Sequence, residues 1–369
     1  MRRATAWQIL AQLVTVLALG LLVHNTLVNL QRNQIASGFG FLSQQSGFQL
    51  GESVALSAPE DSYARALGLG LLNTLKVALL GLVLATLLGT MVGVALLSSN
   101  WLLSRLARTL VEAVRNVPLL LQLFLWYGLL TQGLPPPRQA WHVAGLVLSN
   151  RGLKLPAPAD DPAWPQAALA LLAGLVLAGL YAAWARRRRR STAPSWLLVL
   201  GSPALVFAAH GGGALEWPEL RGFNFTGGWT LSPELLALLL GLVIYTAAFI
   251  AEIVRSGILS VPRGQADAAQ ALGLSSAQRL RLVVLPQALR VIVPPLTSQH
   301  LNLIKNSSLA VAIGYPDLVS VANTAINQTG QAVEGIALIM AAYLTVSLGL
   351  SALMAFYNRR VLRRGGVAA

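Results

Sequence analysis

The sequence predicts an all-α membrane protein with about eight transmembrane helices and both termini in the cytoplasm. Of its 369 residues, 55% are hydrophobic and only 11% are charged, and its mean hydropathy is +0.63. A soluble domain carries about 25% charged residues. The apolar residues gather in long runs, and most of these reach the roughly 20 residues that a helix needs to cross a bilayer. The arginines fall mainly between these runs.

Eight segments are candidate transmembrane helices. The first follows Arg2 and Arg3 and could be mistaken for a signal peptide, but its apolar run is long and no small-residue cleavage site follows. We therefore expect an uncleaved helix there. The fifth is short, contains Pro203 and ends at His210, so it could also be a re-entrant segment. In chain order the eight segments are 8–30, 66–97, 106–131, 166–185, 195–210, 232–254, 286–306 and 334–357.

The arginines predict the orientation, because cytoplasmic loops are enriched in Lys and Arg. The predicted cytoplasmic segments are 98–105, 186–194, 255–285 and the tail from Asn358. Their arginines are Arg105, the run Arg186–Arg190, Arg255, Arg263, Arg279, Arg281, Arg359, Arg360, Arg363 and Arg364. The opposite segments, poorer in cations, are 31–65, 132–165, 211–231 and 307–333. We interpret the arginine run as an anchor at the lipid headgroups rather than as a site for nucleic acid or an acidic partner.

The chain carries few groups suited to catalysis or metal binding. It has no cysteine, which excludes disulfides, thiol chemistry and Cys-ligated zinc. No nucleophile–base pair is recognisable, and no lysine follows the pattern G-x-x-x-x-G-K-[ST], so we expect neither an enzyme nor an ATP-binding chain. The formal net charge of +14 is typical of membrane loops and does not indicate a nucleic-acid partner. The four histidines are scattered along the chain. We expect them to be isolated interface or loop residues that bind no metal; they are His24, His142, His210 and His300.

We divide the chain into three parts. Residues 1–65 hold the first span and a periplasmic segment, residues 66–357 form the transmembrane domain, and residues 358–369 are a basic cytoplasmic tail. Inside the transmembrane domain, 135–230 contains a pair of apolar spans that we expect at the periphery. Its first part, 135–165, is rich in proline and is expected to be an irregular outer loop.

Several intramembrane residues carry structural predictions. Gly89 and Gly93, with Gly81 two turns earlier, predict a close approach of two helices. We expect Lys76, near the outer end of the second span, to extend its ammonium outward rather than to bind substrate. Two pairs at i, i+3 spacing predict intrahelical ion pairs: Glu112 with Arg115, and Glu252 with Arg255.

The predicted cytoplasmic segment 255–285 is too long and too patterned for a simple connection. Residues 267–272 favour a short helix, and Gly273 is well placed as its C-terminal cap. Ser275 and Gln278 fit a capping box, which predicts a second helix. The result is a compact knob with small residues outward, suited to contact a soluble partner. The alternative is an amphipathic helix that serves only as a membrane anchor.

The same segment carries a family motif. Asp267-Ala268-Ala269, three residues, Gly273, nine residues, Val283, one residue and Leu285-Pro286 resemble the EAA motif of bacterial ABC-importer permeases, EAA-x3-G-x9-I-x-LP. Asp267 replaces Glu and Val283 replaces Ile. The flanking sequences AEIVRSGILSVPRGQ and PQALRVIVPPL resemble the polar amino-acid permeases. GFGFL and GFQLG, at 38–42 and 47–51, are similar to the larger general L-amino-acid permeases.

This resemblance implies a type I ABC-importer permease core in the bacterial inner membrane, importing polar or a broad range of L-amino acids. It implies four kinds of partner besides membrane lipid: a second homologous permease, giving a heterodimer, two ATPase subunits and a periplasmic amino-acid-binding protein. ATP and Mg would bind the ATPase, and this chain would hold no cofactor. The residues implied to couple to the ATPase are Asp267, Ala268, Ala269, Leu272, Gly273, Val283, Leu285 and Pro286.

A polar cluster at the outer end of the seventh span is a candidate for the substrate pathway. Its members are Asn302, Lys305, Asn306, Ser307 and Ser308. They could contact an amino-acid carboxylate, or they could only cap the helix. Pro294-Pro295 is expected to break or kink this span. The alternative function is a stand-alone secondary transporter or channel for small polar solutes. Paired broken helices or a chain of mid-membrane carboxylates would favour it, and the sequence indicates neither.

Overall fold

The structure is a computed structural model of the 369-residue chain that describes residues 2–32, 37–188 and 190–363. Arg189 of the arginine run and Arg364 of the tail lie outside the described residues. The chain divides into two compact units, which we treat separately: residues 1–126 with 237–369, and residues 127–236.

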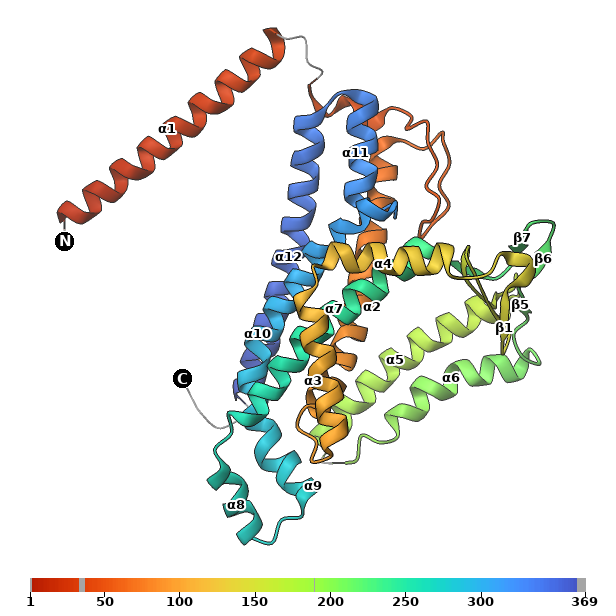
Figure 1. The fold of residues 1–369 in the computed structure, drawn as a ribbon, viewed down its shortest axis with the longest axis vertical. Coiled ribbons are helices and arrows are strands. Elements are labelled where there is room, and N and C mark those ends of the chain that lie inside the picture. The colour runs from red at the N-terminus through yellow and green to blue at the C-terminus, as the bar shows by residue number, and fades with distance from the viewer. Residues whose placement is uncertain (1, 33–36, 189, 364–369) are drawn as a thin grey trace. The chain divides into compact units, whose positions relative to one another are not determined.

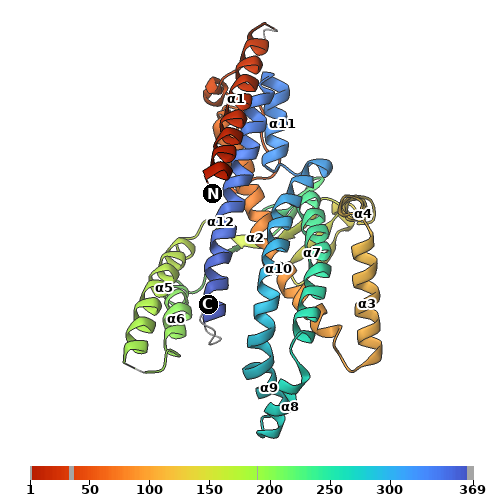
Figure 2. The ribbon, with the colours of Figure 1, turned by 90° about the vertical axis from the view of Figure 1, so that its left-hand side faces the viewer.

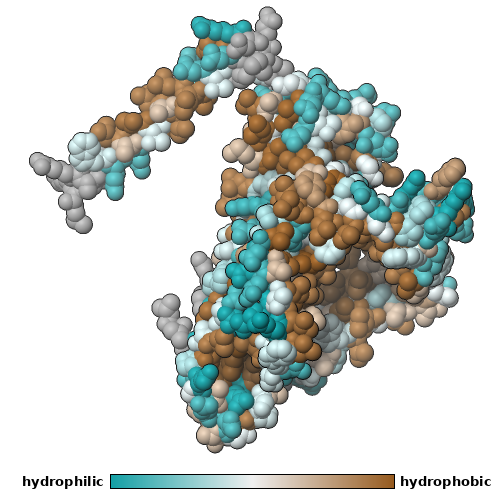
Figure 3. Space-filling model, in the orientation of Figure 1, coloured by the Kyte–Doolittle hydropathy of each residue, from teal (hydrophilic) through white to brown (hydrophobic). Residues whose placement is uncertain are grey.

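The first unit is helical (Figures 1 and 2). Its elements in chain order are α1 (Arg2–Arg32), the short helix η1 (Phe39–Ser43), α2 (Tyr63–Ala95), α3 (Trp101–Asn116), the beginning of α4 (Leu119–Gln132), most of α7 (Pro233–Leu259), α8 (Arg263–Ala271), α9 (Ser276–Arg279), the π-helical turn η3 (Leu280–Val284), α10 (Leu285–Asn306), η4 (Ser307–Ile313), α11 (Leu318–Thr329) and α12 (Ala332–Arg363). The described middle of α1 is apolar and exposed, as a lipid-facing span requires (Figure 3).

Fewer helices qualify as spans than the eight predicted. Within the described residues, six helices are long and apolar enough to cross a bilayer, or up to seven if a bent pair counts as one span. The fifth predicted span, 195–210, forms only the 15-residue helix α6 (Ser195–Ala209), which is shorter than the roughly 20 residues that a crossing needs. Its complete crossing is therefore not supported. The cytoplasmic position of both termini stays a prediction.

The third predicted span, 106–131, is not one straight helix. It consists of α3 and α4, which meet at an angle of 105°. Val117, between them, has an extended backbone with φ −102° and ψ 128°. Pro118 disfavours a helical conformation in the residue before it and lacks a backbone N–H, which accounts for the break.

The helices of the first unit pack closely around α2, as the glycine spacing predicts. A Cβ at Gly89 would lie 2.6 Å from Ile250 Cβ, and one at Gly93 would lie 2.8 Å from the carbonyl oxygen of Ala251, both on α7. A Cβ at Gly81 would meet Leu303 of α10 at 3.2 Å. The predicted close approach of two helices is confirmed, and α10 joins the same bundle.

We expect Gly89→Val to destabilise the chain by about 1–3 kcal/mol, because it overpacks the contact with α7. The measurement is thermal unfolding of the purified chain in detergent. Gly68→Ala is the matched control: it lies on the same helix, and its Cβ would have no neighbour within 4 Å. Equal unfolding temperatures for the two variants would contradict the close packing.

Residues 37–62 fasten onto the ends of α2, α11 and α12. Phe41 is buried and its ring lies 5.7 Å from that of Tyr63. The Gly38 amide donates to Glu334 of α12 at 2.5 Å. Lys76 forms an ion pair with Glu52 of this segment, with Nζ 2.6 Å from Oε1. Lys76 therefore extends toward the predicted outer segment 31–65, as expected, and Glu52 of that segment neutralises its ammonium.

The second unit combines two antiparallel helices with short strands. The helices are α5 (Ala163–Arg187) and α6, and a Cβ at Gly174 would lie 2.4 Å from the carbonyl oxygen of Leu198. The strands are β1 (Trp141–Val143), β2 (Leu146–Ser149), β3 (Gly152–Leu155), β4 (Ala157–Pro158), β5 (Leu215–Glu216), β6 (Glu219–Arg221), β7 (Asn224–Thr226) and β8 (Trp229–Leu231). Three antiparallel sheets result, ordered β1-β2-β3-β8, β4-β5 and β6-β7.

The prediction of an irregular loop at 135–165 is therefore wrong. Ala144 and Gly145, with φ of 50° and 80°, form a two-residue turn between β1 and β2. Such a turn needs a positive φ at both positions, for which Asn-Gly is the usual sequence. Ala-Gly is a weak hairpin signal, and the surrounding prolines suggested a loop instead.

Candidate functional site

The segment predicted as a helical knob forms two helices joined by a glycine. We call residues 262–284 the α8–α9 hairpin. Gly273 has φ +78°, its amide donates to Gln270 O at 2.9 Å, and the Leu274 amide donates to Ala269 O at 3.1 Å. These two bonds form a Schellman cap, in which a glycine accommodates the left-handed backbone. The predicted C-terminal cap is confirmed.

The second helix of the hairpin also begins as predicted. Gln278 accepts a hydrogen bond from the Ser275 amide at 2.9 Å, and the Ser275 hydroxyl accepts one from the Gln278 amide at 3.4 Å. This capping box is confirmed. Arg279 donates to the side chain of Gln270 at 2.8 Å and so ties α9 to α8. The hairpin is therefore held by its own polar contacts.

The hairpin connects to α10 without a break in helical structure. After α9, the π-helical turn η3 leads directly into α10 at Leu285. The Gln287 side chain donates to Val283 O at 3.1 Å across the junction. The hairpin and α10 therefore form one continuous helical path, and α10 packs against α7 and α2 (Figure 2).

The structure separates the predicted coupling residues by exposure. Asp267, Ala268, Gly273 and Pro286 are exposed, and the Leu272 side chain is 81% exposed. Ala269 is only 4% exposed and packs inside the hairpin, so it does not face outward as expected. Val283, in η3, and Leu285, the first residue of α10, are half-buried. The hairpin thus presents a carboxylate, a small side chain and a leucine that its own fold does not cover.

The predicted substrate-pathway residues also divide into two groups. Ser307 and Ser308 donate to the carbonyl oxygens of Ile304 and Lys305 at 2.7 and 2.8 Å, so their hydroxyls cap the end of α10. Asn306 is half-buried. Asn302 and Lys305 are exposed. Helix capping, one of the two alternatives, accounts for the serines and leaves Asn302 and Lys305 as candidates.

Ser298, which was not among the predicted site residues, extends this pair into a stripe. Ser298, Asn302 and Lys305 lie at i, i+4 and i+7, so they share one face of α10, and all three are exposed. We call them the polar face of α10. Their helical spacing was the available signal. Pro294 and Pro295 do not break the helix, because α10 runs continuously from Leu285 to Asn306.

The two predicted intrahelical ion pairs have different outcomes. Glu252 and Arg255 form the predicted ion pair, with Nη2 2.5 Å from Oε1. Within the described residues Glu112 and Arg115 do not pair; Arg115 lies over the ring of Phe249, 5.0 Å from its centre.

His300 is a buried residue rather than an interface or loop residue. Its Nε2 lies 2.9 Å from Thr86 Oγ1, which links α10 to α2. In the described part of the chain, no group of three or more His, Asp or Glu residues could hold a metal ion.

Asp317 is a buried carboxylate between η4 and α11. Its Oδ1 accepts a hydrogen bond from the Ser320 amide at 2.8 Å, which caps α11, and Tyr343 donates to its Oδ2 at 3.4 Å. Burial raises the pKa of Asp317 from 3.8 to about 6, although backbone amides oppose the shift. The folded protein therefore binds this proton more tightly than the unfolded chain does.

Asp317 should make the protein more stable in mild acid. Below pH 4 Asp317 is protonated in both the folded and the unfolded chain, so it does not lower the free energy of unfolding. As the pH rises through 6, the ionisation of Asp317 lowers that free energy by up to about 3 kcal/mol. We expect Asp317→Asn, which keeps an N-cap side chain, to raise the unfolding temperature at pH 7 and to change it little at pH 4. Thermal unfolding at both pH values measures this. Asp160→Asn, at an exposed side chain, should change neither value; equal behaviour of the two variants would contradict the assignment.

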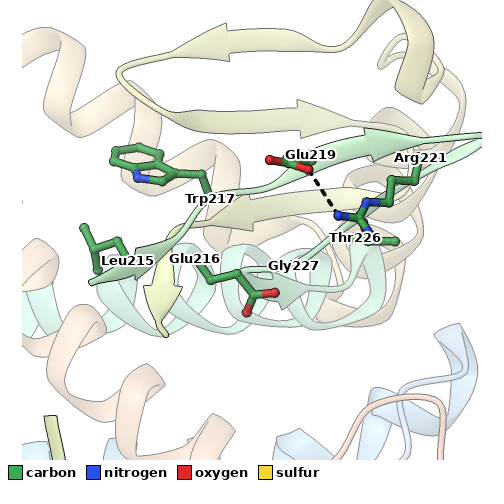
Figure 4. Close-up of a pocket in the computed structure, with 7 residues that line it drawn as sticks. All are labelled: Leu215, Glu216, Trp217, Glu219, Arg221, Thr226 and Gly227. Carbon is green, nitrogen blue, oxygen red and sulfur yellow. Dashed lines mark hydrogen bonds and ion pairs between the residues drawn. The ribbon is translucent and has the colours of Figure 1, made fainter. Parts of the chain in front are cut away.

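A cavity of about 330 Å³ lies in the second unit, beside the β6–β7 hairpin (Figure 4). Its charged pair, Glu219 and Arg221, is 3.4 Å apart with both side chains mostly exposed. None of the sequence-predicted site residues lines it. The cavity is an open hollow in which water solvates the charges, and exposed pairs of this kind contribute little energy.

Comparison with known proteins places this geometry in context. Residues 81–363 match the family model described as binding-protein-dependent transport system inner membrane component. The permease protein YhdX of Escherichia coli is 49% identical over 370 residues, covering 97% of this chain and 94% of that protein. The general L-amino acid transport system permease protein AapQ of Rhizobium johnstonii is 44% identical, covering 97% and 92%. The glutamate/glutamine/aspartate/asparagine transport system permease protein BztB of Rhodobacter capsulatus is 40% identical, covering 97% and 93%.

Proposed function

Since this chain belongs to the family of inner membrane components of binding-protein-dependent transport systems, we propose that it is the permease subunit of an ATP-driven importer of L-amino acids. The α8–α9 hairpin would receive the movement of a separate ATPase. The observation that carries this proposal is the continuous helical path from the exposed Leu272 region, through η3, to the polar face of α10.

The coupling step follows from the shape of this path. The 22 residues of α10 extend about 33 Å at about 1.5 Å per residue, so the helix reaches across a bilayer. Two ATPase subunits that close on binding ATP would push the hairpin of this chain and that of a related permease. A tilt of α10 would then open its polar face to one side of the membrane and close it to the other. The polar face would open to the two sides of the membrane in turn, because the ATPase with and without bound ATP would each favour a different orientation of α10.

The substrate class follows from the polar face and from the relatives. Lys305 and Asn302 offer an ammonium and an amide that can bind the carboxylate shared by all amino acids, through charge-assisted hydrogen bonds. The named substrates of the relatives are L-amino acids, including acidic ones and their amides. We infer a polar or broad amino-acid range. A periplasmic binding protein would deliver the substrate at the bacterial inner membrane, and the second permease would complete the pathway.

Reconstitution tests this function. Proteoliposomes containing this chain, a related permease, the ATPase and the binding protein should take up labelled amino acids when ATP is inside. Omission of either the ATPase or the binding protein should abolish uptake. Uptake by this chain alone, without ATP, would contradict the proposal and favour a secondary transporter or channel.

A further inference from the structure

The four-stranded sheet of the second unit has one face made entirely of apolar side chains. The strand register sets two cross-strand rows on this face. We call it the apolar sheet face; the first row is Trp141, Leu148, Leu153 and Leu231, and the second row is Val143, Leu146, Leu155 and Trp229. Because side chains alternate along a strand, the polar residues of the same strands lie on the opposite face.

The opposite face is the covered one. Val147 and Ser149 on it are buried, and Lys154 donates to Thr230 at 2.5 Å. The His142 ring meets that of Phe225, from β7, with centres 5.9 Å apart. An antiparallel sheet in a soluble protein usually turns its apolar face inward and its polar face to water. Here the centre of the polar face is covered, with Ser149 buried, whereas His142 and Thr230 at its two edges are exposed.

The apolar sheet face is open at both edges of the sheet. Trp141 and Val143 on the edge strand β1 are 56% and 66% exposed, and Trp229 on the edge strand β8 is 60% exposed. The five leucines of this face are half-buried. Exposed to water, this surface would be unfavourable, because apolar area gains free energy when it leaves water.

Chain connections hold the sheet near a membrane surface. Only Ser232 separates the end of β8 from α7, and four residues separate β4 from α5; both helices qualify as membrane spans. A chain advances at most about 3.6 Å per residue, so β8 lies within about 7 Å of the start of α7. The headgroup layer on each side of the hydrocarbon core is itself about 5–7 Å thick.

We propose that the apolar sheet face lies on the lipid bilayer, at the boundary between headgroups and acyl chains. The aliphatic rows would displace water from this boundary. Trp141 and Trp229, on the two edge strands, would act as interfacial anchors, since an indole combines an apolar ring with one polar N–H. The sheet would thereby keep the β6–β7 hairpin, packed on its other face, directed away from the membrane.

The chemistry of the face favours lipid over a protein partner. The two indole N–H groups are the only side-chain hydrogen-bonding groups among its eight residues. A docking surface for a soluble protein is about 56–58% apolar and includes polar contacts. The neighbouring helix α6 has no buried residue among those described, and its exposed side chains are largely apolar. The same unit thus carries a second largely apolar, exposed surface besides the apolar sheet face.

Spin labelling tests this placement, and the chain suits it because it has no native cysteine. We would label Val143→Cys in the full chain, in nanodiscs of phosphatidylethanolamine and phosphatidylglycerol. Collision of the label with oxygen reports lipid, and collision with a water-soluble nickel chelate reports solvent. Leu172→Cys, exposed on α5, is the lipid reference, and Thr226→Cys, exposed on β7, is the solvent reference.

We expect the ratio of oxygen collisions to nickel collisions at Val143 to match the value at Leu172 and to differ from the value at Thr226. A second labelled variant, Trp229→Cys on the opposite edge, should give a collision ratio on the same side of the two references. This second position guards against misfolding of one variant. A ratio at both sites equal to that at Thr226 would place the face in water. Labels shielded from both reagents would show that protein covers the face. Either result overturns the proposal.

Discussion

Leu272→Asp is expected to lower ATP-stimulated uptake by about tenfold or more while leaving the amount of chain in the membrane unchanged. Leu272 is 81% exposed, so the substitution removes no contact that holds the hairpin. In a docked complex the new carboxylate would be desolvated without a partner, and leaving a charge buried at an interface costs about 2–5 kcal/mol. The measurements are uptake into proteoliposomes and co-purification of the ATPase.

Ser276→Asp is the matched control for this variant. It adds the same charge to the same hairpin, but at the first residue of α9, where a negative charge favours the helix. We expect uptake close to that of the unmodified chain. Loss of uptake in both variants would mean that charge on the hairpin, rather than the Leu272 contact, matters. Retention in both would remove Leu272 from the coupling surface.

Lys305→Met should reduce amino-acid uptake by about ten- to a hundredfold, because it removes the only cation of the polar face of α10. Methionine keeps an unbranched, flexible side chain but cannot pair with a carboxylate. A hydrogen bond to a charged group contributes about 1.5–3 kcal/mol, which corresponds to this range. We would measure the concentration dependence of uptake, expecting a higher KM together with a lower maximal rate.

The control for Lys305 lies one turn away. The Ser308 hydroxyl donates to the Lys305 carbonyl, so Ser308→Ala should affect helix capping and leave uptake nearly unchanged. ATPase activity stimulated by the binding protein should persist in Lys305→Met, since the hairpin is intact. Wild-type uptake by Lys305→Met would exclude this side chain from the pathway.

Features that depend on neighbouring residues could be predicted from the sequence. The Schellman cap at Gly273, the capping box of Ser275 and Gln278, and the ion pair of Glu252 with Arg255 each join residues at most a few positions apart. Backbone geometry alone brings such residues together. The same local logic misled at Glu112 and Arg115, because Phe249 from another helix offered Arg115 a competing contact.

Hydropathy identified apolar stretches but not their shape. The run 106–131 is apolar enough for one span, yet Pro118 divides it into α3 and α4. The strands of 141–158 are only two to four residues long; β1, β2 and β3 pair with their neighbours in sequence, and β8, about 75 residues later, adds the fourth strand by pairing with β3. Pairing at such a distance has no local signature.

By itself the sequence determined the membrane class, the place of most spans, the two-helix hairpin and the motif that relates the chain to transport permeases. Mean hydropathy and helix caps act over a turn or a span, so neighbouring residues suffice to specify them. Only the tertiary structure decided that Ala269 faces inward, that Glu52 neutralises Lys76 and that Ser298, Asn302 and Lys305 stay uncovered. Those outcomes depend on which distant helix, strand or loop packs against each face, and periodicity along one helix does not contain that information.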